Sequence, residues 1–120
     1  MKITTFYATD SGESRFRDIT IPFDLEREDA FGHRINFSES YASSNVHMAL
    51  FPADMDQDWH NAPARQLVVV LRGGIEVETT DGECRQWQAG DVFLPADVSG
   101  RGHRTRTLAT RASVVRSITR

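Results

Sequence analysis

Alternation of apolar and polar residues dominates the chain from residue 33 onward. The stretch 75–79, Ile-Glu-Val-Glu-Thr, puts apolar side chains on one face of a strand and acidic ones on the other, and 34–39 alternates in the same way. The stretch 46–51 is apolar enough to predict a strand buried on both faces, and 66–71 is a β-branched, apolar run that ends at Gly73-Gly74. The pattern therefore predicts short strands.

Turn residues separate these stretches. Asp81-Gly82 is typical of a type I′ hairpin, and 84–87 returns from it. Ala89-Gly90-Asp91 marks another turn before a strand over 92–95. The last expected strands cover 105–107 and 112–118. Short strands without long helical patterns between them indicate an all-β sandwich or barrel.

The first 32 residues are less regular than the rest. Residues 8–18 are polar and rich in turn formers, and 19–23 predicts a short edge strand ended by its proline. Residues 24–30 are charged and predict a loop or one turn of helix. We therefore expect an N-terminal arm over residues 1–32, which packs on the barrel formed by residues 33–120 or on a neighbouring copy.

Length and composition are those of an ordinary soluble domain. The chain has 120 residues, 39% apolar and 26% charged, which suits one domain with one core. Its longest apolar run, 67–71, is too short to cross a bilayer, and the first residues carry no apolar segment of a signal peptide. Cys84 is the only cysteine, so no disulfide forms within the chain, and a cytoplasmic location is the default expectation.

The net charge of −3 argues against nucleic acid as the main partner. The charge is uneven, because no acidic residue follows Asp97 and six arginines do: Arg101, Arg104, Arg106, Arg111, Arg116 and Arg120. This end is either a basic tail for phosphate or nucleic acid, or a set of solvent-facing side chains that pair with acidic strands such as the one carrying Glu76 and Glu78. We favour the second interpretation and expect neither a nucleic-acid nor a membrane partner.

Two histidines are the best candidates for chemistry. His60 lies in the stretch Trp-His-Asn-Ala-Pro-Ala-Arg-Gln over 59–66, and His103 follows Gly102, 43 residues further on. Two imidazoles from separate strands, with the side-chain oxygen of Gln66, would face one pocket inside a small barrel. That arrangement predicts a site for a metal or a small molecule.

Residues 59–103 resemble the cupin family, whose members are small double-sheet β-barrels of the jelly-roll type. The family's first motif runs Gly, five residues, His-x-His, three or four residues, Glu, six residues and Gly. His60 takes the position of its first histidine, Gln66 that of the glutamate, and Gly73 that of the closing glycine. The second histidine position falls on Ala62.

The family's second motif opens at Gly90-Asp91 and closes on a histidine, here His103, with a gap two residues longer than usual and Pro95 one place early. More narrowly, the chain is similar to small single-domain bacterial cupins that carry Trp-His-x-Ala-Pro-x-Arg-Gln and Gly-x-Gly-His, as 59–66 and 100–103 do. The resemblance implies an all-β fold: a single cupin-type double-stranded β-helix (jelly-roll) barrel with an N-terminal arm. It also points to a homodimer.

A complete family site would hold a divalent metal with three histidines and a glutamate. This chain keeps two imidazoles, replaces the carboxylate by Gln66 and has nothing to offer at Ala62, so its metal motif is degenerate. His60, Gln66 and His103 would still make a half-open metal site, because catalytic metals often have three protein ligands and a water. The resemblance thus implies either a weakly held divalent Fe, Mn, Ni or Zn ion or no cofactor.

Neighbouring residues could complete or support the site. His47 joins it if its side chain points inward, and Asp58 and Asp97 are candidate partners for the imidazoles. Arg65 directly precedes Gln66, and Arg104 directly follows His103. Successive side chains of a strand alternate, so both arginines should point away from the pocket.

Three functions remain open. The first is a small-molecule-binding cupin of unassigned substrate, with a pocket lined by His60, Gln66 and His103. The second is a metal-dependent oxygenase or isomerase that acts on a small organic acid. The third is a non-catalytic sensor or interaction module. The sequence assigns no catalytic residue, leaves open whether the protein is an enzyme, and does not name the small molecule.

Overall fold

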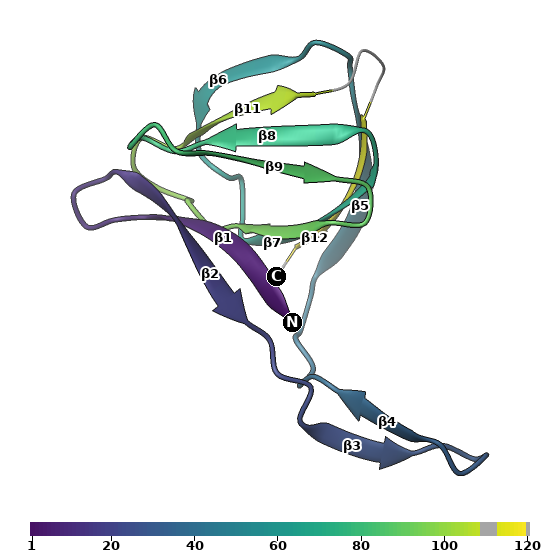
Figure 1. Ribbon diagram of the computed structural model, residues 1–120. Helices are drawn as coiled ribbons and strands as arrows, with labels where there is room; N and C mark the ends of the chain where they lie inside the picture. The colour runs from purple at the N-terminus through teal and green to yellow at the C-terminus, as the bar shows by residue number, and fades with distance from the viewer. Residues whose placement is uncertain (109–112, 120) are drawn as a thin grey trace.

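Two facing β-sheets form the body of the molecule, and a two-stranded hairpin projects away from them (Figure 1). The computed structural model describes residues 1–108 and 113–119. Within those residues the strands are β1 (Lys2–Ala8), β2 (Ser14–Thr20), β3 (Leu25–Glu28), β4 (Arg34–Phe37), β5 (Asn45–Phe51), β6 (Asp56–His60), β7 (Gln66–Arg72), β8 (Gly74–Glu78), β9 (Cys84–Gln88), β10 (Val92–Pro95), β11 (His103–Thr107) and β12 (Ser113–Thr119). The described residues contain no helix that is long and apolar enough to cross a membrane.

The strands are divided between sheets that mix distant parts of the chain. One sheet has the order β2-β1-β10-β7-β12-β5, the other β6-β11-β8-β9, and β3 and β4 form a small sheet of their own. Only β1 and β10 pair in parallel among the strand pairs described; the others are antiparallel. This interleaving brings β6 and β11, which carry the two candidate histidines, side by side.

The core lies between the two sheets and is built by alternation along each strand. On β8, Ile75 and Val77 are buried, whereas Glu76 and Glu78 face outward, as the sequence pattern predicts. Aromatic rings fill the centre, with Trp87 stacked on Phe93 at a ring-centroid distance of 4.3 Å. The buried cluster comprises Phe6, Val68, Val70, Ile75, Val77, Trp87 and Phe93.

The beginning of the chain belongs to the sheets, not to an arm lying on them. β1 and β2 are strands of the six-stranded sheet, and Phe6, on β1, is fully buried in the core. Residues 24–30, expected as a loop or helical turn, contain β3. This strand pairs with β4 through the turn 29–33, so the pair extends past residue 32, where the arm was expected to end. The segment that leaves the body is therefore 21–44 and not 1–32, because the backbone of residues 4–6 pairs with β10 and Phe6 packs in the core.

The strand over 46–51 was predicted to be buried on both faces, and this is wrong. β5 is an edge strand of the six-stranded sheet. Its inward side chains, at 47, 49 and 51, line a cavity, whereas Val46, Met48 and Leu50 on the outer face are exposed, Met48 by 68%. An apolar run does not reveal whether another layer covers its second face.

The arginines near the end of the chain pair with acidic strands where they are described. Arg106 bonds to Glu76 and Glu78, and Arg104 bonds to both carboxylate oxygens of Asp56. A hydrogen bond from Gln86, reinforced by Arg106, lowers the pKa of Glu76 despite its partial burial. These contacts agree with the ion-pair interpretation of this end. Arg111, the Arg116 side chain and Arg120, and residue 112 of the last expected strand, lie outside the described residues.

Candidate functional site

A cavity of about 380 Å³ lies between the two sheets, and His60, Gln66 and His103 all line it. His60 ends β6 and His103 begins β11, and these two residues are paired directly across the strands. Their rings lie 4.5 Å apart between centroids, inclined at 56°. Gln66 reaches the cavity from β7 on the facing sheet. The structure thus brings together the three residues that the sequence singled out.

Each imidazole is held through its Nδ1 atom. The Nδ1 of His60 donates to the backbone oxygen of Asp58 at 2.6 Å, because a carbonyl oxygen only accepts. The Nδ1 of His103 donates to the Oδ2 of Asp97, also at 2.6 Å. In the neutral rings, Nε2 is then the unprotonated nitrogen, free to accept a hydrogen bond or coordinate a cation.

Asp97 is the buried partner that orients His103. Its side chain is fully buried, and His103 is only 5% exposed. Oδ1 of Asp97 has no hydrogen-bond partner within the described part of the chain. A carboxylate behind a histidine fixes the ring and supports positive charge on it. The carboxylate of Asp58 plays no such part, because it bonds to the backbone N–H of Trp59.

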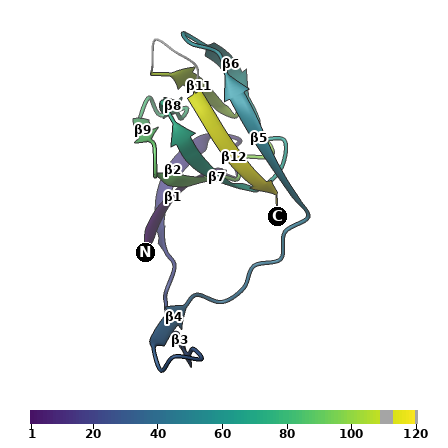
Figure 2. The ribbon, with the colours of Figure 1, turned by 90° about the vertical axis from the view of Figure 1, so that its right-hand side faces the viewer.

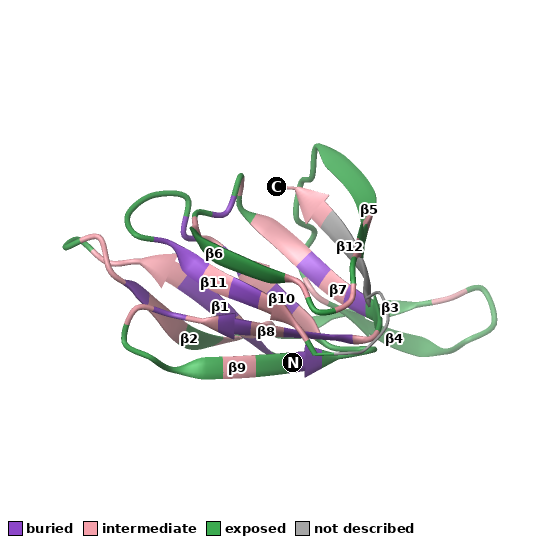
Figure 3. Cartoon of the chain, turned by 90° about the horizontal axis from the view of Figure 1, so that it is seen from above, coloured by how far each residue is buried: buried purple, intermediate pink, exposed green. Residues whose placement is uncertain are grey.

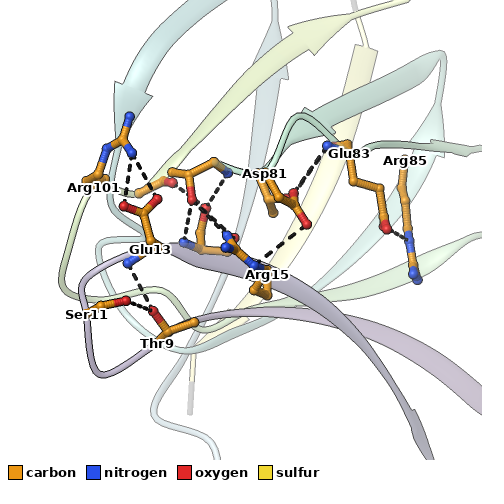
Figure 4. A network of polar contacts seen from close by, with 12 residues as sticks. Thr9, Ser11, Glu13, Arg15, Asp81, Glu83, Arg85 and Arg101 are labelled. Atoms are coloured by element: carbon orange, nitrogen blue, oxygen red, sulfur yellow. Dashed lines mark hydrogen bonds and ion pairs between the residues drawn. The ribbon is translucent and has the colours of Figure 1, made fainter.

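The loop that leads from Asp97 to His103 is held by several other segments. Buried Ser14 donates from Oγ to the carbonyl oxygen of Gly102 at 2.7 Å and accepts from the N–H of Thr80. Arg101 bonds to both carboxylate oxygens of Glu13 (Figure 4). The turn between β1 and β2 and the turn between β8 and β9 thus meet at this loop, so distant parts of the chain fix the position of His103.

The first part of that loop is fastened to the residues after β6. Asn61 donates from its side chain to the backbone oxygens of Ser99 and Gly100. The N–H of Ala62 bonds to the backbone oxygen of Asp97 at 3.2 Å. Ala62 is buried and lines the cavity. The position that carries a second histidine in the family motif is therefore at the site, but it brings only a methyl group.

Further lining residues come from positions that the sequence did not single out. Phe6 lies with its ring 4.7 Å from that of His103, and Gln57 and Thr105 are paired across β6 and β11. Thr105 was predictable, because it stands two residues after His103 and strand side chains alternate. Phe6 carried no such signal, since it lies in the segment expected to be an arm.

The outlying candidates are placed as follows. His47 lines the cavity from β5 but is largely exposed. Arg65 is exposed, and Arg104 is turned outward to its ion pair, as strand alternation predicts. His33, the remaining histidine of the chain, is exposed in the hairpin turn far from the cavity lining and bonds to Asp29.

The cavity offers fewer metal ligands than a tightly held divalent ion needs. Among the described residues, no group of three or more His, Cys, Asp or Glu side chains is placed to hold a metal ion. His47 also lines the cavity but belongs to no such group, so His60 and His103 remain with the neutral amide of Gln66. Asp97 is committed to Nδ1 of His103. Sites that hold zinc or similar ions firmly use at least three imidazole, thiolate or carboxylate ligands.

Comparisons with known proteins bear on the fold. No protein-family model matches the chain, and no curated protein matches its sequence. Among solved structures, the CENP-C cupin domain of Drosophila melanogaster is 19% identical, with 80% of this chain and 74% of that chain covered and a TM-score of 0.51. Drosophila CENP-C bound to CAL1 is 13% identical, with 80% of each chain covered and a TM-score of 0.50. A cupin domain from Bordetella pertussis is 19% identical, with 84% and 96% covered and a TM-score of 0.48.

The two likenesses to Drosophila CENP-C, together with the strand order, define the class of fold. The chain has the cupin fold, an all-β jelly-roll barrel also called a double-stranded β-helix. The fold class and the cupin resemblance predicted from the sequence are confirmed at this level. Identities this low carry no information about ligand or activity, because the same fold hosts many functions.

Proposed function

We propose that this protein binds a small organic molecule in the cavity between its sheets, with His60 and His103 as the polar contacts. The observation that carries the proposal is the pair of facing imidazoles, each anchored at Nδ1, which leaves two Nε2 atoms for a ligand. Pre-oriented polar groups in a mostly apolar concavity are the usual composition of a ligand site.

The walls indicate the kind of ligand. Phe51, Val68 and Phe93 supply apolar surface, while the imidazoles and the Gln66 amide supply polar contacts. A volume of about 380 Å³ is at the small end of ligand pockets. These features fit a compact molecule with an apolar body and one head that donates hydrogen bonds, such as a small alcohol or amine. The O–H or N–H groups of that head would donate to the two Nε2 atoms.

The first test is ligand binding by the wild-type protein and single histidine variants. A thermal-shift screen of small alcohols and amines, with analogues that lack the donor group, should find a stabilising compound. His60→Ala and His103→Ala should each weaken its binding by about tenfold or more, since each removes a buried hydrogen bond to the ligand, about 1–2 kcal/mol. Arg65→Ala, an exposed neighbour of the motif, should bind as the wild type does. An unchanged thermal shift in both histidine variants would place the ligand elsewhere.

A metal-dependent oxygenase or isomerase is the second candidate. It is favoured by one observation, the buried carboxylate behind His103, which is a common arrangement around metal-binding histidines. His60, Gln66 and His103 would be the ligands, and a bound ion would polarise a substrate oxygen. Because the donor set lacks a carboxylate, we give this function second place.

Elemental analysis separates the two candidates. We expect Fe, Mn, Ni and Zn well below one ion per chain in protein purified without an affinity tag or chelator. We also expect no stoichiometric retention after dialysis against each metal and then buffer. The reason is that two imidazoles and an amide give weak affinity. One ion per chain, absent from His60→Ala, would establish the metalloenzyme candidate instead.

The cytosol remains the expected location. Cys84 is exposed and forms no disulfide. Partial desolvation and the nearby Glu78 and Glu76 raise the pKa of its thiol, which therefore stays protonated near neutral pH. Neither property requires an oxidising compartment.

A further inference from the structure

The β3–β4 hairpin is an ordered structure with one apolar face that no described part of the chain covers. Its turn is built on Asp29, whose Oδ1 accepts from the N–H groups of Phe31 and His33. Its polar face carries the ion pair of Arg34 with Glu26. The strand register places the other four side chains on the opposite face: Leu25, Arg27, Ile35 and Phe37.

That opposite face is apolar and exposed. Leu25, Ile35 and Phe37 are each more than two-fifths exposed, and Phe31 in the turn is 85% exposed. Arg27 lies over the Phe37 ring. An isolated two-stranded hairpin is marginally stable in water, so an ordered one needs a surface to pack against. Figure 2 shows the hairpin standing away from both sheets, joined to β5 by the long connection 38–44.

A second uncovered apolar surface lies on the outside of the six-stranded sheet. Val46, Met48 and Leu50 stand on the outer face of β5, and Leu71 is exposed on β7. Figure 3 colours β5 and the hairpin mostly as exposed, whereas β1, β8 and β10 carry buried residues. β12 lies between β5 and β7 in this sheet. Exposed apolar side chains gathered on one face often mark an interaction site in soluble proteins. As the terminal strand of its sheet, β5 also has an unpaired backbone edge.

We propose that these two surfaces belong together across a homodimer, in which the β3–β4 hairpin of each chain packs its apolar face on the outer face of β5 and β7 of the other. The exchange is reciprocal. A dimer with one two-fold axis therefore covers the hairpin face and the sheet face of each chain. The shape of one chain supports a second copy as the occupant. Its radius of gyration is 16.0 Å, whereas a compact chain of this length has about 13.6 Å.

The proposal is independent of the ligand site and is tested by mass in solution. Light scattering after size exclusion should give twice the 13.5 kDa chain mass for the wild type. Phe37→Ser, on the apolar face of the hairpin, and Met48→Glu, on the outer face of β5, should each give the single-chain mass. Asn36→Ser, on the polar face of the same hairpin strand, should remain at twice the chain mass. Circular dichroism checks that each variant is folded.

Mixing the two monomeric variants distinguishes hairpin exchange from other dimers. A mixed pair keeps one intact contact, formed by the hairpin of the Met48→Glu chain and the sheet of the Phe37→Ser chain. The mixture should therefore regain part of the doubled mass, which neither variant shows alone. A wild type with single-chain mass, a Phe37→Ser variant that stays dimeric, or a mixture without recovery would each overturn the proposal.

Discussion

Gly102→Ala should lower the free energy of unfolding by about 3 kcal/mol, and hence the melting temperature by about 12 °C. Gly102 has a φ of +78°, a conformation that costs an alanine about 1 kcal/mol. The larger effect is steric. A Cβ at this position would lie 2.1 Å from the backbone oxygen of His60 and 2.4 Å from its carbonyl carbon. Backbone atoms do not rotate out of the way, so β6 would have to move.

Gly82→Ala is the matched control for this change. Gly82 has nearly the same φ, +84°, but an added Cβ would meet nothing within 4 Å. It should therefore cost about 1 kcal/mol, the conformational part alone. Chemical unfolding of both variants gives the comparison. Equal losses would show that the approach of Gly102 to His60 has no energetic weight.

Gly102→Ala should also damage the ligand site in the fraction of the protein that remains folded. The clash pushes apart the ends of β6 and β11, where His60 and His103 are paired. Ligand affinity at a temperature where Gly102→Ala is folded should therefore fall by at least tenfold, since a shift of about 1 Å is enough to break a hydrogen bond. Gly82→Ala, in the turn between β8 and β9, should bind as the wild type does.

The central strands and the meeting of the three site residues follow from short-range patterns in the sequence. Ile75 to Thr79 alternates over a full strand, and Asp81-Gly82 marks the turn after it, so β8 and β9 were predictable. The type I′ geometry expected for that turn is wrong, because Gly82 has a positive φ and Asp81 does not. His60, Gln66 and His103 were predictable as a group because their spacing matches a known motif.

What could not be predicted depends on contacts between distant parts of the chain. β2 is mostly polar, with only Phe16 and Ile19 apolar, and the strand forms because β1 pairs with it along its whole length. The partner of His60 is a backbone oxygen, which leaves no trace in the side-chain sequence. Asp97 was one of two candidate carboxylates, and only the path of the loop chooses between it and Asp58.

The choice of Asp97 leads to the second large effect. Asp97→Ala should lower the free energy of unfolding by about 3 kcal/mol, because it leaves the Nδ1–H of buried His103 without an acceptor and opens a cavity behind the ring. Asp97→Asn fills the same space and should cost less. Its amide can, however, donate to Nδ1 and so reverse which ring nitrogen carries the proton. Ligand affinity should then fall by 10–100-fold, the usual effect of losing the carboxylate behind a functional histidine.

Asp58 provides the control, because it stands behind the other imidazole but holds it only through its backbone. Asp58→Asn keeps that carbonyl oxygen and should leave both stability and ligand affinity near the wild-type values. Nitrogen-15 NMR of the imidazoles reports the tautomers directly. We expect His103 to change from Nδ1–H to Nε2–H in Asp97→Asn, with His60 unchanged in both variants. If Asp97→Asn and Asp58→Asn behave alike, the buried carboxylate does not set the state of His103, and the anchored pair of imidazoles loses its role as the basis of the site.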